Sequence, residues 1–135
     1  MPTCVVRGHD VRVTDVLLLE HPPPMLRVLR ESLLHQPGLH IVGEAGTLDH
    51  ALALAARLQP DVVVVDAEIP GLDAVRTSTL LREHAPASAV LVVTLEPDRI
   101  RRLTRRDQRI VAVGKIDGAA ALLGALRRIG VRNLD

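Results

Sequence analysis

The fold is decided by one stretch of the chain, Val62-Val63-Val64-Val65-Asp66-Ala67-Glu68-Ile69-Pro70-Gly71. A run of β-branched apolar residues with no polar alternation predicts a strand that is buried on both faces. The segment from Ile69 to Gly71 has the residues of a turn, so the strand must end near Asp66. In open α/β folds, ligands and chemistry gather at the carboxyl edge of the sheet, and this sequence places Asp66 there.

The composition narrows the classes of protein to which the chain can belong. Its 135 residues, 47% hydrophobic and 24% charged, fit one globular domain. A net charge of +1 gives no global reason to expect binding to nucleic acid or to an anionic membrane. The absence of every Phe, Tyr and Trp removes the stacking residues that single-stranded nucleic-acid binders normally need. The lone Cys4 excludes a disulfide framework and a cysteine metal site. Because no apolar run has the length of a membrane span or a signal peptide, we expect a cytoplasmic protein.

Apolar strands alternate with helical patterns along the rest of the chain. We interpret residues 1–13 as a leader and residues 14–135 as one domain. The predicted strands are residues 16–19, 39–43, 62–65, 89–93 and 110–113, and the predicted helices include residues 74–84 and 98–106. Three further helices are predicted from apolar residues at helical spacing. The first has Leu26, Leu29 and Leu33 on its inner face. The second follows a cap at Thr47, and its inner face consists of Leu48, Leu52, Ala55 and Leu58; the inner face of the last consists of Ala119, Leu122, Leu126 and Ile129. Five strand–helix repeats predict an α/β fold, a single doubly wound five-stranded parallel sheet with helices on both faces.

Polar side chains end four of the five predicted strands. Glu20 ends the first, Asp66 the third, Thr94 the fourth, and Lys115 follows the fifth. A parallel sheet brings all these ends to one side. Two carboxylates and a turn carbonyl suit Mg²⁺, and a hydroxyl and an ammonium beside them suit the oxygens of a phosphoryl group. Asp66 would then be the nucleophile, although such residues are also common at strand ends simply because strand ends meet water.

These motifs resemble the signature of the CheY-like receiver domain of bacterial response regulators. The matching segments are Leu19-Glu20-His21-Pro22, the residues from Asp66 to Asp73, Val93-Thr94 and Gly114-Lys115. Val42-Gly43-Glu44-Ala45 and Gln59-Pro60-Asp61-Val62-Val63 are similar to the NarL/FixJ subfamily, whose receivers precede a LuxR-type helix-turn-helix. The resemblance spans about residues 15–129 and implies a flavodoxin/CheY-like fold.

The resemblance also implies roles for individual residues. Asp66 matches the aspartate that accepts a phosphoryl group from a sensor histidine kinase or a small phosphodonor. Glu20, Asp66 and the main-chain carbonyl of Glu68 match the Mg²⁺ ligands. Thr94 matches the hydroxyl that moves toward the phosphate, and Lys115 matches the ammonium that pairs with it. The chain would therefore not be an enzyme beyond self-catalysed phosphotransfer and autodephosphorylation.

Two positions depart from the family pattern. Leu19 stands where the family has the first of two adjacent acids, so we expect weakened Mg²⁺ binding. Ala112 stands where the family has an aromatic switch residue. The family's usual coupling between movement of the hydroxyl and burial of that aromatic ring therefore cannot operate in the same form. These departures favour an alternative, a pseudo-receiver that serves as an interaction or dimerisation module without phosphorylation. A small phosphatase or a flavin-binding enzyme on the same fold is a third alternative.

The helix predicted at residues 98–106 is rich in arginine. We expect Ile100, Leu103 and Thr104 to face the sheet, and Arg99, Arg102, Arg106 and Arg109 to share one side, with Arg101 and Arg105 alongside. One interpretation is a solvated helix face. The other is a partner surface, in which the region Arg99–Arg109 and the last helix contact a second copy or an effector.

Overall fold

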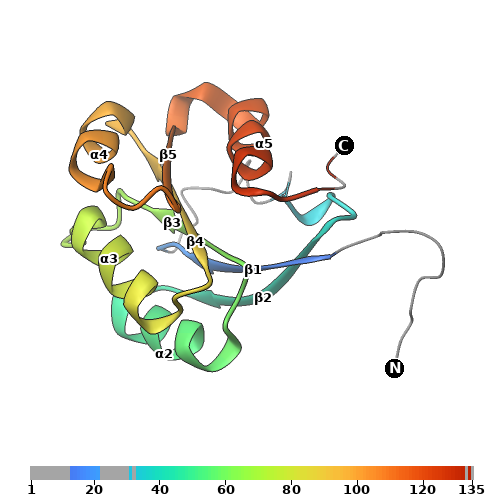
Figure 1. Cartoon of the computed structure of the whole chain (residues 1–135), viewed down its shortest axis with the longest axis horizontal. Helices are drawn as coiled ribbons and strands as arrows, with labels where there is room; N and C mark the ends of the chain where they lie inside the picture. The colour runs from blue at the N-terminus through green and yellow to red at the C-terminus, as the bar shows by residue number, and fades with distance from the viewer. Residues whose placement is uncertain (1–12, 22–30, 32, 133, 135) are drawn as a thin grey trace.

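The computed structural model describes residues 13–21, 31, 33–132 and 134. Strands and helices alternate along this part of the chain (Figure 1). Its strands are β1 (Thr14–Leu19), β2 (Leu39–Ala45), β3 (Val62–Asp66), β4 (Ala89–Thr94) and β5 (Ile110–Gly114). Its helices are α2 (Leu48–Leu58), α3 (Ala74–His84), α4 (Pro97–Thr104) and α5 (Gly118–Ile129), and a 3₁₀ turn, Lys115–Asp117, joins β5 to α5. The predicted alternation is confirmed over the described residues.

The five strands form one parallel sheet in the order β2-β1-β3-β4-β5. The strand order reverses between β1 and β3, because β2 lies beyond β1 on one side and β4 and β5 follow β3 on the other. Such a reversal leaves a crevice at the carboxyl edge, where open α/β sheets bind their ligands. The register pairs Leu19 with Val65, so the next residues, Glu20 and Asp66, flank this point of reversal.

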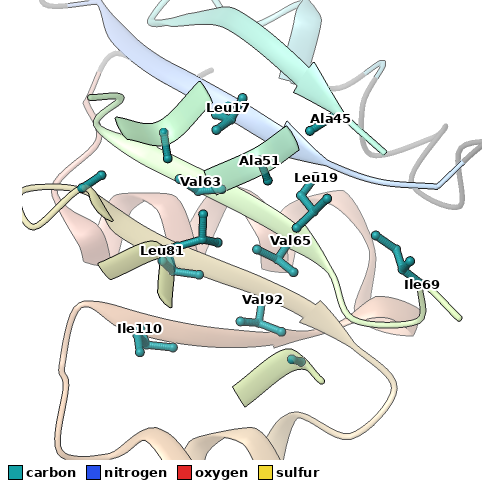
Figure 2. Close-up of a cluster of buried hydrophobic side chains, with 14 of the residues drawn as sticks. Leu17, Leu19, Ala45, Ala51, Val63, Val65, Ile69, Leu81, Val92 and Ile110 are labelled. Atoms are coloured by element: carbon teal, nitrogen blue, oxygen red, sulfur yellow. The ribbon is translucent and has the colours of Figure 1, made fainter. Parts of the chain in front are cut away.

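Helices cover the two faces of the sheet separately (Figure 1). Alternate residues of each strand point to opposite faces, as β geometry requires. On one face, Leu17 and Val63 pack with α2, α3 and α4; on the other, Val16 and Leu91 pack with α5. Since the sequence contains no Phe, Tyr or Trp, both clusters consist of aliphatic side chains. Figure 2 shows the first of them, which contains Leu17 and Val63.

Local signals place the helices as predicted. The Thr47 hydroxyl accepts a hydrogen bond from the His50 amide at 3.2 Å and begins α2. In the same way, Asp73 begins α3 by accepting from the amides of Val75 and Arg76, both at 3.1 Å. This second cap lies just after the turn that follows Asp66.

Several details of the prediction are corrected by the structure. Leu103 does not face the sheet: its side chain is 54% exposed, whereas Ile100 and Thr104 are buried. α4 ends at Thr104 rather than at residue 106, β1 begins at residue 14, and β2 continues to Ala45.

The inner face of α2 is centred on two buried alanines rather than on leucines. Ala51 and Ala55 are buried, while Leu48, Leu52 and Leu58 are half-buried. Small side chains on this face let the helix pack close to the sheet. Most of the predicted first helix, and the leader except Val13, lie outside the described residues.

Candidate functional site

The carboxyl edge of the sheet brings together the polar strand ends expected from the sequence. Asp66 pairs with Val93 in the register of β3 and β4, and Thr94 pairs with Gly114 in that of β4 and β5. Glu20, Asp66, Thr94 and Lys115 therefore follow or end four consecutive strands of one sheet. Glu20, Asp66 and Thr94 are buried, and Lys115 is half-buried.

Asp66 is held by an ion pair and by its own turn. The Lys115 ammonium donates to Oδ1 of Asp66 at 2.7 Å, reaching across the end of β4, and the Glu68 amide donates to the same oxygen at 2.9 Å. The side chain of Asp66 is 0% exposed and that of Lys115 is 12% exposed. Oδ2 of Asp66 is buried and has no hydrogen-bond partner among the described residues. One oxygen is thus held by two hydrogen bonds, while the other is buried without one in the described part of the chain.

Thr94 and Glu68 both bind backbone amides of the loop between β4 and α4. The Thr94 hydroxyl accepts from the Glu96 amide at 3.0 Å, and the Glu68 carboxylate accepts from the Leu95 amide at 2.9 Å. The sequence analysis assigned a role only to the main-chain carbonyl of Glu68. The role of its side chain carries no sequence signal, because its partner is a backbone group 27 positions away.

Leu19 supplies no polar atom to this edge. Its side chain is fully buried in the aliphatic cluster beneath α2 and α3, with Val65 of the adjacent strand (Figure 2). The site therefore has the carboxylates of Glu20 and Asp66 at its strand ends. In the described part of the chain, no group of three or more His, Cys, Asp or Glu side chains is arranged to hold a metal ion.

These residues are compatible with a cation site that has fewer protein ligands, with water completing the coordination. The unpartnered Oδ2 of Asp66 is an oxygen that a hard divalent cation would satisfy, and Glu20 ends the neighbouring strand. A main-chain carbonyl such as that of Glu68 would be the third protein ligand. Water would have to fill the remaining positions, as Mg²⁺ commonly allows.

Ala112 of β5 is buried and contacts α4 through its backbone. The Arg101 guanidinium donates to the Ala112 carbonyl oxygen at 3.1 Å and pairs with Asp98 at 2.9 Å. β5 is an edge strand of the described sheet, so this arginine satisfies a carbonyl that no neighbouring strand reaches. A direct side-chain link from α4 to β5 therefore exists at the position where the resemblance led us to expect an aromatic ring.

The arginines of the α4 region do not form the single stripe predicted from helical spacing. Because α4 ends at Thr104, Arg106 and Arg109 lie beyond it. Arg109 donates to the Ala87 carbonyl at 3.1 Å and so joins two loops at the amino edge of the sheet. Arg99, Arg102, Arg105 and Arg106 are exposed, and none of them pairs with a carboxylate in the described part of the chain.

Comparison with known proteins identifies this arrangement. The family described as "Response regulator receiver domain" matches residues 16–121, well over half of the chain. The chain belongs to the response regulator receiver family. This assignment confirms the resemblance seen in the sequence, and it favours a receiver over the phosphatase or flavin-binding enzyme considered there.

Curated relatives of this receiver domain include proteins of two kinds. It is 34% identical over 77 residues to a protein-glutamate methylesterase/protein-glutamine glutaminase of Methanospirillum hungatei, covering 57% of this chain and 22% of that protein. It is 31% identical over 81 residues to the nitrate/nitrite response regulator NarP of Escherichia coli, covering 60% of this chain and 38% of that protein. The receiver domain thus spans well under half the length of either relative.

Solved structures agree with the fold. The response regulator domain of Thermotoga maritima CheB is 26% identical, with a TM-score of 0.73 over 92% of this chain and 99% of that one. The receiver domain of NarL from Mycobacterium tuberculosis is 20% identical, with a TM-score of 0.72 over 87% of this chain and 95% of that one, a likeness of fold alone. In the described part of the receiver domain, no helix has both the length and the apolar character needed to cross a membrane.

Proposed function

We propose that this receiver domain accepts a phosphoryl group on Oδ2 of Asp66, from a sensor histidine kinase or a small phosphodonor. The observation that carries the proposal is the asymmetry of the Asp66 carboxylate. Lys115 and the Glu68 amide both bind Oδ1, whereas Oδ2 has no hydrogen-bond partner among the described residues. A carboxylate oriented in this way presents one defined oxygen as a nucleophile.

The transfer forms one bond and breaks one. Oδ2 of Asp66 bonds to phosphorus while the bond from phosphorus to the donor's leaving group breaks, and the leaving group keeps that electron pair. Lys115 offsets the negative charge that builds on the oxygens of the transferring phosphoryl group. The Thr94 hydroxyl donates its proton to no acceptor among the described residues, so it is able to donate a hydrogen bond to one of these phosphoryl oxygens.

Glu20, Asp66 and the Glu68 carbonyl are the residues that would hold Mg²⁺. When bound, the cation would supply further neutralisation of the phosphoryl oxygens. Because Leu19 replaces one acid with a buried hydrocarbon, we expect this receiver domain to need a higher Mg²⁺ concentration than a site with two adjacent acids.

The output would pass through dimerisation or an effector that contacts α4 and α5. Support comes from the exposed arginines Arg99, Arg102, Arg105 and Arg106, which lack carboxylate partners among the described residues. Such a cationic surface suits an acidic protein surface. We assign no nucleic-acid binding to this domain and no membrane contact. We place the domain at residues 14–135 and a leader at residues 1–13, and we expect a cytoplasmic location.

A phosphorylation-independent interaction module is the second candidate. Leu19 in the hydrophobic core and Ala112 at the position expected for the aromatic residue favour it. The two candidates differ in a single measurable property, the reactivity of Asp66.

The deciding experiment is intact-mass spectrometry after incubation with acetyl phosphate and increasing Mg²⁺. We expect a phosphoryl mass increment that depends on Mg²⁺ and disappears in Asp66→Asn. No increment at saturating Mg²⁺, with the folded state verified by circular dichroism, would contradict the proposal and support the interaction module.

A further inference from the structure

A hollow of about 370 Å³ lies where the first turns of α2 and α3 meet the turn that follows Glu68. A volume of this size is typical of a small-molecule site. Leu48, Ile69 and Leu72 give the hollow an apolar wall. Ile69 belongs to the first aliphatic cluster and lies at its margin, beyond the end of β3 (Figure 2). The hollow therefore offers an apolar surface on which the body of a small molecule can pack.

Thr77 of α3 lines the same hollow and has a hydroxyl that the fold leaves without a partner. The residue is 1% exposed, and its Oγ1 is buried and makes no hydrogen bond within the described part of the chain. The next two residues, Ser78 and Thr79, each donate to the main-chain carbonyl four positions earlier, at 2.7 and 3.1 Å. A buried polar group without a partner costs free energy. Threonine in a helix has two χ1 rotamers, so this hydroxyl can turn toward an acceptor placed in the hollow.

Arg76 adds an unpaired cation to the lining. Its side chain is exposed and pairs with no carboxylate among the described residues. It lies in the first turn of α3, where a cation opposes the helix dipole and no acid offsets it. Asp73 is the one acid among the described residues that line the hollow, and its Oδ1 already accepts from two amides of α3. The helix itself gains nothing from the charge of Arg76, but an anion in the hollow would.

We propose that this hollow binds a small amphipathic carboxylate. Its apolar body packs against Leu48, Ile69 and Leu72, and its carboxylate pairs with Arg76 and accepts a hydrogen bond from Thr77. One arginine and one hydroxyl match a single negative charge, whereas the nearby carboxylate of Asp73 opposes a polyanion such as a phosphate. The proposal goes beyond the phosphoryl-acceptor function and does not depend on it, because none of these contacts involves Asp66.

The test uses two aromatic probes of the same body, 3-phenylpropionate and the uncharged 3-phenylpropan-1-ol. Each is titrated into the full chain and followed by the NMR shifts of the side-chain methyl groups. The chain contains no Phe, Tyr or Trp, so new ring-current shifts of this size come from the probe. We expect the largest saturable shifts at Leu48, Ile69 and Leu72. The acid should bind about two- to fivefold more tightly than the alcohol, as one exposed ion pair predicts.

Two variants separate the charge from the hydroxyl. Arg76→Gln should remove the preference for the acid and leave the affinity for the alcohol unchanged. The matched control is Arg102→Gln, which removes an exposed arginine without a carboxylate partner from α4 and should bind like the wild type. Thr77→Val should weaken binding of the acid several-fold and yet raise the melting temperature by a few degrees, because it removes a buried hydroxyl that has no partner. A purely structural threonine would not combine these two effects.

The outcomes decide the proposal directly. Saturable shifts at the three apolar side chains, with a preference for the acid that only Arg76→Gln abolishes, would support it. Equal affinity of the wild type for acid and alcohol would overturn it, as would shifts centred elsewhere in the chain or no saturable shift at millimolar probe. Unchanged binding of the acid by Thr77→Val would overturn the role of the hydroxyl. Asp66→Asn should bind both probes like the wild type, so a failure of phosphorylation leaves this test intact.

Discussion

The ammonium of Lys115 lies 2.7 Å from Oδ1 of Asp66, although the two residues are 49 positions apart and the end of β4 separates their strands. The pair sits at the carboxyl edge with the carboxylate fully buried. Removing one partner of a buried pair leaves an uncompensated charge, which costs more than the pair itself contributes.

Replacing Lys115 should therefore destabilise the receiver domain through Asp66. For Lys115→Met we expect a loss of about 1–3 kcal/mol in the free energy of unfolding, less than for a fully enclosed pair because water reaches this edge. The measurement is urea denaturation at neutral pH. In an Asp66→Asn background the same substitution should cost much less. Equal costs in both backgrounds would show that the two residues are not coupled.

Restoring an acid at residue 19 should strengthen Mg²⁺ binding at the expense of stability. Leu19→Asp adds a carboxylate beside Glu20 but places it where a fully buried leucine stands. We expect tighter Mg²⁺ binding by calorimetry and a loss of at least about 2 kcal/mol in unfolding free energy. Leu19→Asn has the same shape without the charge, so it should show the loss of stability alone. Equal Mg²⁺ affinity in the two variants would refute the role given to this position.

The Thr94 hydroxyl should matter for transfer more than for folding. Thr94→Val keeps the shape of a buried side chain but removes the acceptor of the Glu96 amide and the donor to the phosphoryl group. We expect phosphorylation by acetyl phosphate to slow by roughly ten- to a hundredfold, as for loss of one transition-state hydrogen bond. Thr94→Ser should retain most of the rate. If Thr94→Val reacts as fast as wild type, the hydroxyl has no part in the transfer.

Acid should weaken an ion pair at the opposite edge of the sheet. Arg82 donates to Asp107 at 2.8 Å and to the Ser88 carbonyl at 2.7 Å, tying α3 to the loops before β4 and β5. Burial tends to raise the pKa of Asp107, but the hydrogen bonds from Arg82 and the Arg109 amide, with the charges of both arginines, hold that pKa below its ordinary value of 3.8.

A lowered pKa in the folded state means that Asp107 stabilises the fold above its ordinary pKa. That contribution is fully present above the unfolded-state pKa of about 3.8. It is lost as the pH falls from there through the lower pKa that Asp107 has in the folded state. Asp107→Asn should cost about 0.5–1 kcal/mol near pH 7, a modest figure because the pair is partly exposed. Thermal denaturation of both proteins from pH 7 to pH 3 should show the difference shrinking toward acid. A difference that is constant with pH would exclude the ionised carboxylate as its source.

The sequence alone determined the order of the elements and the edge at which chemistry would gather. Uninterrupted valines before Asp66, turn residues after it and caps such as Thr47 are local signals, because burial and backbone geometry act on neighbouring residues. The same signals placed Glu20, Thr94 and Lys115 at one edge, since parallel strands end together. The family pattern supplied the roles of these residues but not their contacts.

Only the tertiary structure decided which atoms meet. Strand order sends Lys115 across β4 to Oδ1 of Asp66, and the two loops at the edge bring the Glu68 carboxylate to the Leu95 amide. α4 ends at Thr104 and so leaves Arg109 beyond the helix, and Leu103 within α4 is exposed instead of facing the sheet. Contacts between residues far apart in the chain depend on register and packing, which no short pattern encodes.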